Sequence, residues 1–301
     1  MSTHQEHNQP QLSTKKLLFS IILNVIITVS QFVGGIISGS LSLMSDAAHN
    51  LTDVISLIIS YTAAKLKLKK QTEHETFGYK RAEILAAFIN ASTLIVLSIY
   101  LGIESFKRFN NITEIETELV IWLSLVALVA NSLSVVLLSN DAKNNINMKS
   151  AYLHLLTDAL VSLAVLLGGL LMKYYQLYWI DPTLTLLISL YLMYLSWDIL
   201  LESTKMLMLF APGNIHIKDI EKSILRTNKI KNIHHVHLWR LNDHDIYLEA
   251  HVQFKENISM SEWDSICSDI EKQLWADFKI NHSMLQPEFL RDDDKLFIIQ
   301  D

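Results

Sequence analysis

Long apolar runs, separated by short polar joints, fill the first two thirds of the chain. A helix that crosses a bilayer core of about 30 Å needs about 20 apolar residues. Stretches of this kind occupy residues 17–37, 42–64, 82–106, 118–139, 150–172 and 183–204. The joint Ser38-Gly39-Ser40 is so tight that the first two helices must form a hairpin. The pattern predicts an all-α membrane domain of six helices over residues 15–208, preceded by a polar, disordered cytoplasmic tail, residues 1–14.

Beyond Pro212 the apolar positions follow shorter periods, as in a soluble domain. The pattern predicts the order α-β-β-α-β: helix 216–227, strands 233–241 and 245–254, helix 260–277 and strand 281–287. Along the first strand, Ile233, His235 and His237 alternate with His234, Val236 and Leu238. Ser259 and Glu262 form a capping box that starts the second helix. This order predicts a small α+β domain over residues 209–301, with its helices on one face of the sheet.

Basic residues are concentrated in the joints on one side of the predicted membrane domain. They precede the first span, crowd the joint after the second and flank the joint after the fourth: Lys15, Lys16, Lys65, Lys67, Lys69, Lys70, Lys80, Arg81, Lys143 and Lys149. Cytoplasmic loops carry such an excess of Lys and Arg. We therefore expect a multi-pass protein in the lipid bilayer of the cell membrane (plasma or inner), with both termini and the α+β domain in the cytoplasm.

The composition is typical of a membrane protein and argues against several other classes of protein. Hydrophobic residues make up 50% of the chain and charged residues 19%, whereas about 25% is usual for charged residues in soluble proteins. The net charge of −6 comes without a basic stripe, so no nucleic-acid partner is expected. The single cysteine, Cys267, excludes a disulfide framework and a cysteine-rich zinc module.

Two of the predicted spans carry ionisable residues at the same spacing. His49 and Asp53 lie four positions apart in the second span, and His154 and Asp158 repeat this in the fifth. Residues four apart share one face of a helix. The surroundings repeat too, since both copies match S-x-x-x-H-x-L-T-D. Ionisable side chains inside a membrane are costly, so a duplicated set predicts a functional site.

The chemistry of these four residues suits a divalent metal ion, and zinc in particular. Two neutral imidazoles and two carboxylates make a tetrahedral set of nitrogen and oxygen ligands. Two aspartates also cancel the charge of the ion. Because metal binding requires deprotonated ligands, protons are expected to replace the metal when it leaves. The sequence therefore predicts a secondary transporter, not an enzyme, that exchanges zinc for protons.

Other readings of the four residues remain open at this point. They could join helices by hydrogen bonds, or hold a closed structural zinc ion. Cadmium, cobalt, iron or manganese could be the cargo, because His/Asp sites suit several divalent metals. A membrane-bound metal sensor would bind without flux. An intramembrane metalloenzyme is disfavoured, since the chain has no H-E-x-x-H and four protein ligands leave no open position for water.

Three segments resemble the cation diffusion facilitator family of zinc transporters: SGSLSLMSDAAHNLTDV, FGYKRAEILAAFIN and SAYLHLLTDAL. The resemblance implies a homodimer that exchanges zinc for protons and alternates between inward-open and outward-open states. It places the family's transport site on His49, Asp53, His154 and Asp158. A histidine at position 49 implies a preference for zinc over cadmium. The short joint after the fourth span resembles bacterial members.

The predicted soluble domain resembles the family's metallochaperone-like C-terminal domain. The segments HHVHLW, EAHVQF and INHSMLQPE supply His234, His251, His282 and Glu288, the last two in the pattern H-x-x-x-Q-x-E. The resemblance implies a regulatory zinc site that bridges two protomers. His235, His237 and His244 are interpreted as ordinary strand and turn residues.

Asp46 lies one helical turn before His49 and has two interpretations. It could act behind the metal ligands, orienting one of them or relaying protons. Equally, it could cap the start of its helix near the Ser38-Gly39-Ser40 hairpin.

Overall fold

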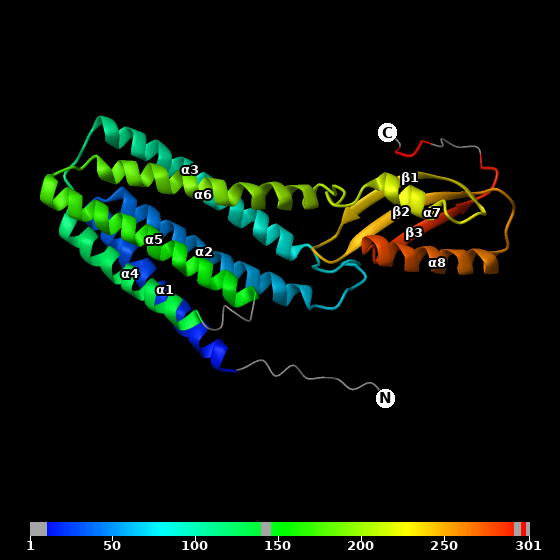
Figure 1. Ribbon diagram of the computed structural model, residues 1–301, viewed down its shortest axis with the longest axis horizontal. Coiled ribbons are helices and arrows are strands. Elements are labelled where there is room, and N and C mark those ends of the chain that lie inside the picture. The colour runs from blue at the N-terminus through cyan, green and yellow to red at the C-terminus, as the bar shows by residue number, and fades with distance from the viewer. Residues whose placement is uncertain (1–10, 140–145, 292–295, 299–301) are drawn as a thin grey trace. The chain divides into compact units, whose positions relative to one another are not determined.

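The computed structural model describes residues 11–139, 146–291 and 296–298 (Figure 1). The first ten residues of the predicted tail lie outside the described residues. The chain divides into two compact units. One comprises Met1–Ile59 and Ile89–Ile199, and the other comprises Ser60–Phe88 and Leu200–Asp301.

Six long helices account for the predicted membrane domain. They are α1 (Gln11–Ser38), α2 (Leu41–Lys67), α3 (Ala82–Asn110), α4 (Thr117–Leu138), α5 (Ile146–Tyr175) and α6 (Ile180–Leu207). The hairpin between α1 and α2 is confirmed, and Gly39 takes a φ of +70° that suits glycine. The prediction of a disordered tail to residue 14 is wrong for its last residues, because α1 already begins at Gln11. Extending an existing helix by a few polar residues costs little once the apolar span has nucleated it.

Four of these helices, α3 to α6, are long and apolar enough to cross a membrane, and Val25–Ser38 of α1 is a shorter apolar stretch. Helix α2 is less apolar than the other five because its buried face is polar. That face carries Asp46, His49, Asn50 and Asp53. A polar stripe on one helix of a membrane domain is expected where it faces the interior of the bundle.

Glycines allow close packing between α1, α4 and α5, which lie side by side (Figure 1). A Cβ on Gly169 of α5 would lie 3.0 Å from Cγ1 of Ile121 and 3.6 Å from its backbone nitrogen on α4. A Cβ on Gly34 of α1 would collide with Leu123, which also belongs to α4. Small residues let membrane helices approach closely, and dispersion contacts then hold them together.

The predicted α+β domain is confirmed in its element order and close to its predicted bounds. It consists of α7 (Ile217–Ile224), β1 (Ile230–Arg240), β2 (Ile246–Phe254), α8 (Met260–Phe278) and β3 (His282–Glu288). The sheet order is β1-β2-β3, with β1 antiparallel and β3 parallel to β2. Helix α8 provides the crossover that a parallel pair requires.

One face of the sheet packs on both helices of this domain. Leu248, Ala250 and Val252 of β2 point into a core that also contains Ile224 of α7 and Leu274 of α8. The alternate residues of β2 therefore lie on the face without helices. The capping box is confirmed in its main bond, since the Ser259 hydroxyl accepts a hydrogen bond from the Glu262 backbone nitrogen at 3.3 Å.

Strand β1 departs from the predicted alternation. Ile233 and His234 are both buried although they are consecutive, and the register with β2 shifts between His234 and His237. His235 sits in the left-handed region with a φ of +51°. The backbone nitrogens of His235 and Val236 donate to the carbonyls of residues 296 and 297 instead. The prediction of strict alternation is wrong because a β-bulge at His235 shifts the alternation by one residue, so that Ile233, Val236 and Leu238 share the core face. Bulges are not visible in a hydrophobic pattern.

The connector between α2 and α3 belongs to the same unit as the α+β domain and contacts it directly. Lys80 Nζ lies 2.8 Å from Asp245 Oδ2, and the rings of Phe77 and Tyr247 meet edge to face at 6.0 Å. Arg240 at the end of β1 pairs with Glu202 of α6. The turn between β1 and β2 is therefore bound to the end of α6 and to the approach to α3.

Candidate metal centres

The two H-x-x-x-D pairs come together in the structure as a closed ring of four side chains. Each imidazole Nε2 lies near a carboxylate oxygen of both aspartates. His49 Nε2 is 3.5 Å from Asp53 and 3.7 Å from Asp158, and His154 Nε2 is 3.4 Å from Asp53 and 3.6 Å from Asp158. We call these four residues the transmembrane site.

The spacing of the transmembrane site fits a tetrahedral metal. Ligand atoms about 2.0–2.2 Å from a zinc ion lie about 3.3–3.6 Å from one another. The four contacts of 3.4–3.7 Å match those edges or exceed them slightly. They are also longer than the 2.7–2.9 Å or so of a strong charge-assisted hydrogen bond.

Three of the four carboxylate oxygens of this ring lack, within the described chain, the hydrogen bonds that buried carboxylates normally make. Among the described residues, neither oxygen of Asp158 has a hydrogen-bond partner, and the same holds for Oδ2 of Asp53. Buried polar atoms are paired in the great majority of cases, so each exception calls for an explanation. A bound cation would supply what these oxygens lack.

Exposure differs sharply between the two ends of the transmembrane site. The side chains of Asp158 and His49 are 0% and 9% exposed, whereas those of Asp53 and His154 are 21% and 44% exposed. Because α2 and α5 run in opposite directions (Figure 1), Asp53 and His154 lie toward the end where α2 finishes and α5 begins. The site is therefore open at that end and closed at the other.

Asp46 does not cap a helix, which decides against one of its two interpretations. It lies inside α2 and is fully buried. Its Oδ2 accepts a hydrogen bond from Gln31 Nε2 at 2.6 Å and another from Ser162 Oγ at 3.4 Å. Gln31 Oε1 in turn accepts from Asn50 Nδ2 at 3.4 Å. Asp46 thus links α1, α2 and α5 next to the transmembrane site.

Asp181 of α6 accepts hydrogen bonds from the start of α2, although no pattern in the sequence indicates this residue. Its Oδ2 accepts from the backbone nitrogen of Leu41 at 2.9 Å. Its Oδ1 accepts from the Ser42 backbone nitrogen at 3.1 Å and from the hydroxyls of Ser40 and Ser42 at 2.6 Å each. The sixth predicted span begins after Asp181, which would leave this carboxylate in a joint. Its burial shows that it belongs to the helix bundle.

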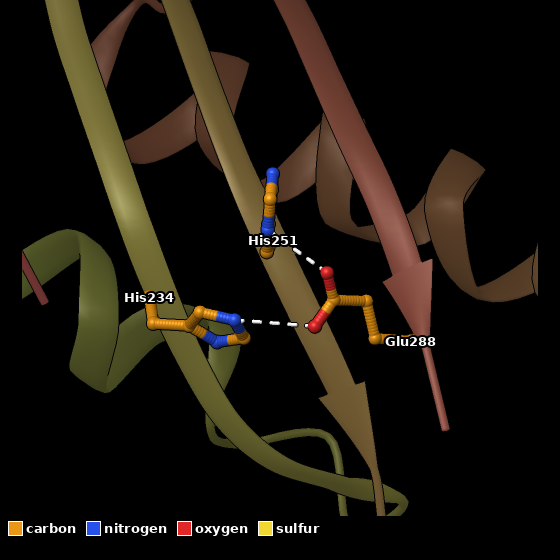
Figure 2. A group of neighbouring side chains, drawn as sticks. All are labelled: His234, His251 and Glu288. Atoms are coloured by element: carbon orange, nitrogen blue, oxygen red, sulfur yellow. Dashed lines mark ion pairs between the residues drawn. The ribbon is translucent and has the colours of Figure 1, made fainter. Parts of the chain in front are cut away.

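A second set of possible ligands lies on the face of the sheet without helices, as Figure 2 shows. His234 Nε2 is 3.1 Å from Glu288 Oε2, and His251 Nδ1 is 2.9 Å from Glu288 Oε1. One ligand atom from each residue lies within 4.8 Å of the others. The register of β1 and β2 sets His234 directly opposite His251. We call these three residues the cytoplasmic cluster.

Within one chain, His282 of the predicted set of four lies away from this cluster. It begins β3, whereas Glu288 ends it, so the two lie about 20 Å apart along the strand. Its ring packs on Tyr247 at 4.3 Å instead. The bulge brings a different histidine close, since His235 stacks on His251 with ring centroids 4.7 Å apart.

Two family profiles together match nearly the whole chain. Residues 17–208 match the profile of the cation efflux transmembrane domain, and residues 212–289 match that of the cation efflux protein cytoplasmic domain. The chain belongs to the cation efflux family. Its membership confirms the resemblance seen in the sequence and the predicted fold class, a six-helix membrane domain followed by a small cytoplasmic α+β domain.

Several relatives in the cation efflux family align over nearly the whole chain. A "cadmium, cobalt and zinc/H(+)-K(+) antiporter" of Bacillus velezensis is 36% identical, over 94% of this chain and 91% of the relative. "Zinc transporter ZitB" of Pectobacterium atrosepticum is 30% identical over 97% and 90%. "Metal cation efflux system protein CzcD" of Cupriavidus metallidurans is 30% identical over 96% and 90%. The chain is accordingly a multi-pass membrane transporter of this family.

Proposed function

We propose that this protein exports zinc from the cytoplasm in exchange for protons, and that the ion passes through the transmembrane site. The observation that carries the proposal is the ring formed by His49, Asp53, His154 and Asp158. Its spacing suits a tetrahedral ion, and its buried carboxylate oxygens have no other partner among the described residues. The names of the relatives, which include zinc transporters and an antiporter, support the same cargo and exchange.

Charge balance explains why protons are the counter-substrate. Two carboxylates and two neutral imidazoles make a loaded site formally neutral with a divalent ion. When the ion leaves, both carboxylates remain beside each other in a region of low dielectric constant. Two neighbouring negative charges without a cation repel each other strongly in such a region. Protons binding to the vacated ligands restore neutrality, and their release on the other side lets the next ion bind.

The proposal extends to the surroundings of the transmembrane site. Both termini and residues 209–301 lie in the cytoplasm. The membrane domain, residues 15–208, lies in the cell membrane. Two copies form a homodimer, a state that fits the matched cytoplasmic domain. The cytoplasmic cluster binds a regulatory zinc ion. Its three ligands His234, His251 and Glu288 leave a fourth position for water or for a residue of a second copy.

A second candidate function is export of cadmium or cobalt as well as zinc, in exchange for potassium as well as protons. The Bacillus velezensis relative is named for these three metals and for exchange with both protons and potassium. The same ligand set in this chain would accept each of the three metals. Four protein ligands around one ion still leave no place for an activated water, so a hydrolytic reaction is not proposed.

Flux through reconstituted vesicles tests the proposal. Full-length protein in vesicles with an imposed pH gradient is expected to accumulate zinc, and to do so faster than vesicles without a gradient. Asp53→Ala removes one ligand and is expected to abolish the flux, whereas Asp219→Ala removes an exposed carboxylate on α7 and serves as the matched control. Zinc binding without flux would favour a sensor instead. Equal flux in both variants would contradict the assigned site.

A further inference from the structure

The transmembrane site is closed at the end that lies toward the start of α2. From His49 back to the first turn of that helix, the residues that face the bundle interior are fully buried: Ser42, Leu43, Ser45 and Asp46. The facing part of α5 is closed in the same way, since Asp158, Ser162 and Val165 are also 0% exposed. The described side chains on this side of the site are therefore all closed off from solvent.

A group of hydrogen bonds at the start of α2 joins this closed end to three other helices. Asp181 of α6 accepts four of them, two from hydroxyls and two from backbone N–H groups of Ser40, Leu41 and Ser42. Ser105 of α3 donates to the Pro182 carbonyl at 2.6 Å. Arg108 of α3 donates to the Gly39 carbonyl at 2.6 Å, and the Glu116 nitrogen before α4 donates to the Ser38 carbonyl at 3.1 Å.

Asp181 is not needed merely to cap α2. The helix already has a local cap, because the Ser40 hydroxyl accepts from the Leu43 nitrogen at 3.2 Å, as an N-cap serine does. Asp181 comes from a position 140 residues away in the chain and adds bonds between helices. Its carboxylate is completely buried and accepts from all of its partners. Removing the acceptor carboxylate destabilises the folded state by more than the net contribution of its hydrogen bonds, because the buried donors are left without an acceptor.

We propose that Asp181 is a positioning residue that holds the extracytoplasmic end of the zinc path shut while the cytoplasmic end is open. We call its four bonds to the start of α2 the α2–α6 tie. The start of α2, eight positions before His49, can separate from α6 only if this tie breaks. The tie therefore favours the arrangement seen here, and opening toward the outside requires its loss. The inference rests on the proposed function for the orientation of the chain.

The tie predicts a graded series of variants at one position. Asp181→Asn keeps an amide oxygen that can accept from Ser40 and Ser42, but its nitrogen cannot accept from Leu41. Asp181→Ala removes all four bonds. Loss of buried hydrogen bonds of ordinary strength shifts a two-state equilibrium by about tenfold or more. The outward-open population is therefore expected to rise in the order parent, Asp181→Asn, Asp181→Ala.

Labelling of a single cysteine at a buried position measures that population without any transport. Cys267→Ser removes the native thiol, and Leu43→Cys introduces one in the fully buried stretch between the tie and His49. A membrane-impermeant maleimide is added to the outer side of cells that express the full-length protein. The labelling rate at position 43 is expected to rise about tenfold or more in Asp181→Ala and by a smaller factor in Asp181→Asn.

Controls separate the tie from general weakening of the fold. Ser259→Ala removes the cap of α8 in the other unit and is expected to leave labelling at position 43 unchanged. If Asp181→Ala does not fold, Ser42→Ala removes one hydroxyl donor to the carboxylate and is expected to raise labelling modestly. Zinc binding at equilibrium should keep its stoichiometry in every variant that retains the four ligands.

The possible results are distinct. Labelling that stays at the parental rate in both Asp181 variants, or that rises equally in Ser259→Ala, overturns the proposal and leaves Asp181 a purely stabilising residue. A rise seen only from the cytoplasmic side also overturns it. Failure of the parent protein to move zinc in vesicles would reject the proposed function, whereas the labelling series would still report on the tie.

Discussion

The transmembrane site and the cytoplasmic cluster contain the same kinds of side chain, but their buried carboxylates differ in their hydrogen-bond partners. Asp158 is buried with neither oxygen hydrogen-bonded by a described residue. Glu288 is equally buried, yet Gln286 Nε2 and Arg291 Nη1 each lie 3.2 Å from its Oε1, and the two histidines of the cluster lie at 2.9 and 3.1 Å. Within the described chain, the Asp158 carboxylate thus accepts no hydrogen bond, whereas Glu288 has cationic and hydrogen-bonding neighbours.

This difference indicates different relations to a metal ion. A cation that entered the transmembrane site would meet carboxylate oxygens that accept no hydrogen bond from a described residue. A cation that enters the cytoplasmic cluster must compete with Arg291 for Glu288, so part of its binding free energy is offset. A cargo site has to be filled on every cycle, whereas a regulatory site has to respond only when the concentration rises. The contrast predicts that the two sites differ in how severely their loss affects transport.

The largest effect is expected from Asp158. Asp158→Asn removes a ligand charge from the ring, and we expect zinc flux in vesicles to fall more than about 100-fold. Even substitution of a residue that only hydrogen-bonds to a metal ligand lowers metal affinity or activity by about 10–100-fold. Asp219→Asn, on the exposed surface of α7, is the matched control and should leave flux within about twofold of the parent. Comparable flux in the two variants would remove the basis for calling this ring the cargo site.

The next effect concerns selectivity at His49. Exchanging its imidazole for a carboxylate in His49→Asp gives a harder set of three oxygens and one nitrogen, and the resemblance to the family implies broader selectivity for that set. We expect the ratio of zinc to cadmium transport to fall by about tenfold, which corresponds to about 1.4 kcal/mol. Competition between the two ions in vesicles measures it, and an unchanged ratio would show that selectivity is set elsewhere.

Loss of the cytoplasmic cluster is expected to reduce regulation and to spare transport. In an Asp158→Asn background, zinc should still raise the thermal midpoint through the cluster, by an amount that corresponds to about 2.7 kcal/mol at a free concentration 100 times Kd. Glu288→Gln should abolish that rise, while the exposed Glu256→Gln should not. In the otherwise unaltered chain, Glu288→Gln should retain flux at high zinc. A loss of flux as severe as that of Asp158→Asn would end the distinction between the two sites.

The smallest effect is expected from the ion pair between Lys80 and Asp245. Burial alone would raise the pKa of Asp245, but hydrogen bonds from Lys80, Asn281 and Asn242 outweigh it and leave the pKa below its ordinary value. The stabilisation is therefore present above pH 3.8 and is lost as the pH falls through the lowered pKa. Lys80→Gln should cost at most about 1 kcal/mol, because both groups are partly exposed. Chemical unfolding at pH 7 should show the difference between parent and variant, and that difference should shrink as the pH is lowered well below 3.8.

Much of the architecture could be predicted because it follows from patterns that act locally. Six apolar runs predict the six helices, and the capping box at Ser259 predicts the start of α8. The pairing of His49 with Asp53 and of His154 with Asp158 was also predictable, since a duplicated H-x-x-x-D sets each pair on a helix face and buried charges rarely occur without a partner.

The remaining features depend on contacts between distant segments. The change of alternation along β1 depends on a bulge whose backbone nitrogens donate to the carbonyls of residues 296 and 297, so no local pattern in β1 could reveal it. His282 and Glu288 share a short motif in the sequence, but an extended strand separates them in the fold. Asp181 carries no local signal of its role, because its partners lie about 140 residues earlier in the chain.

The opposite directions of α2 and α5 give the transmembrane site an approximate twofold symmetry. One end of the ring presents His49 with Asp158, and the other presents His154 with Asp53. An ion therefore meets one imidazole and one carboxylate whichever end is open, and it detaches from the same two ligand types when it leaves by the opposite end. Repeating one motif on two antiparallel helices makes the last step of loading and the first step of release chemically equivalent.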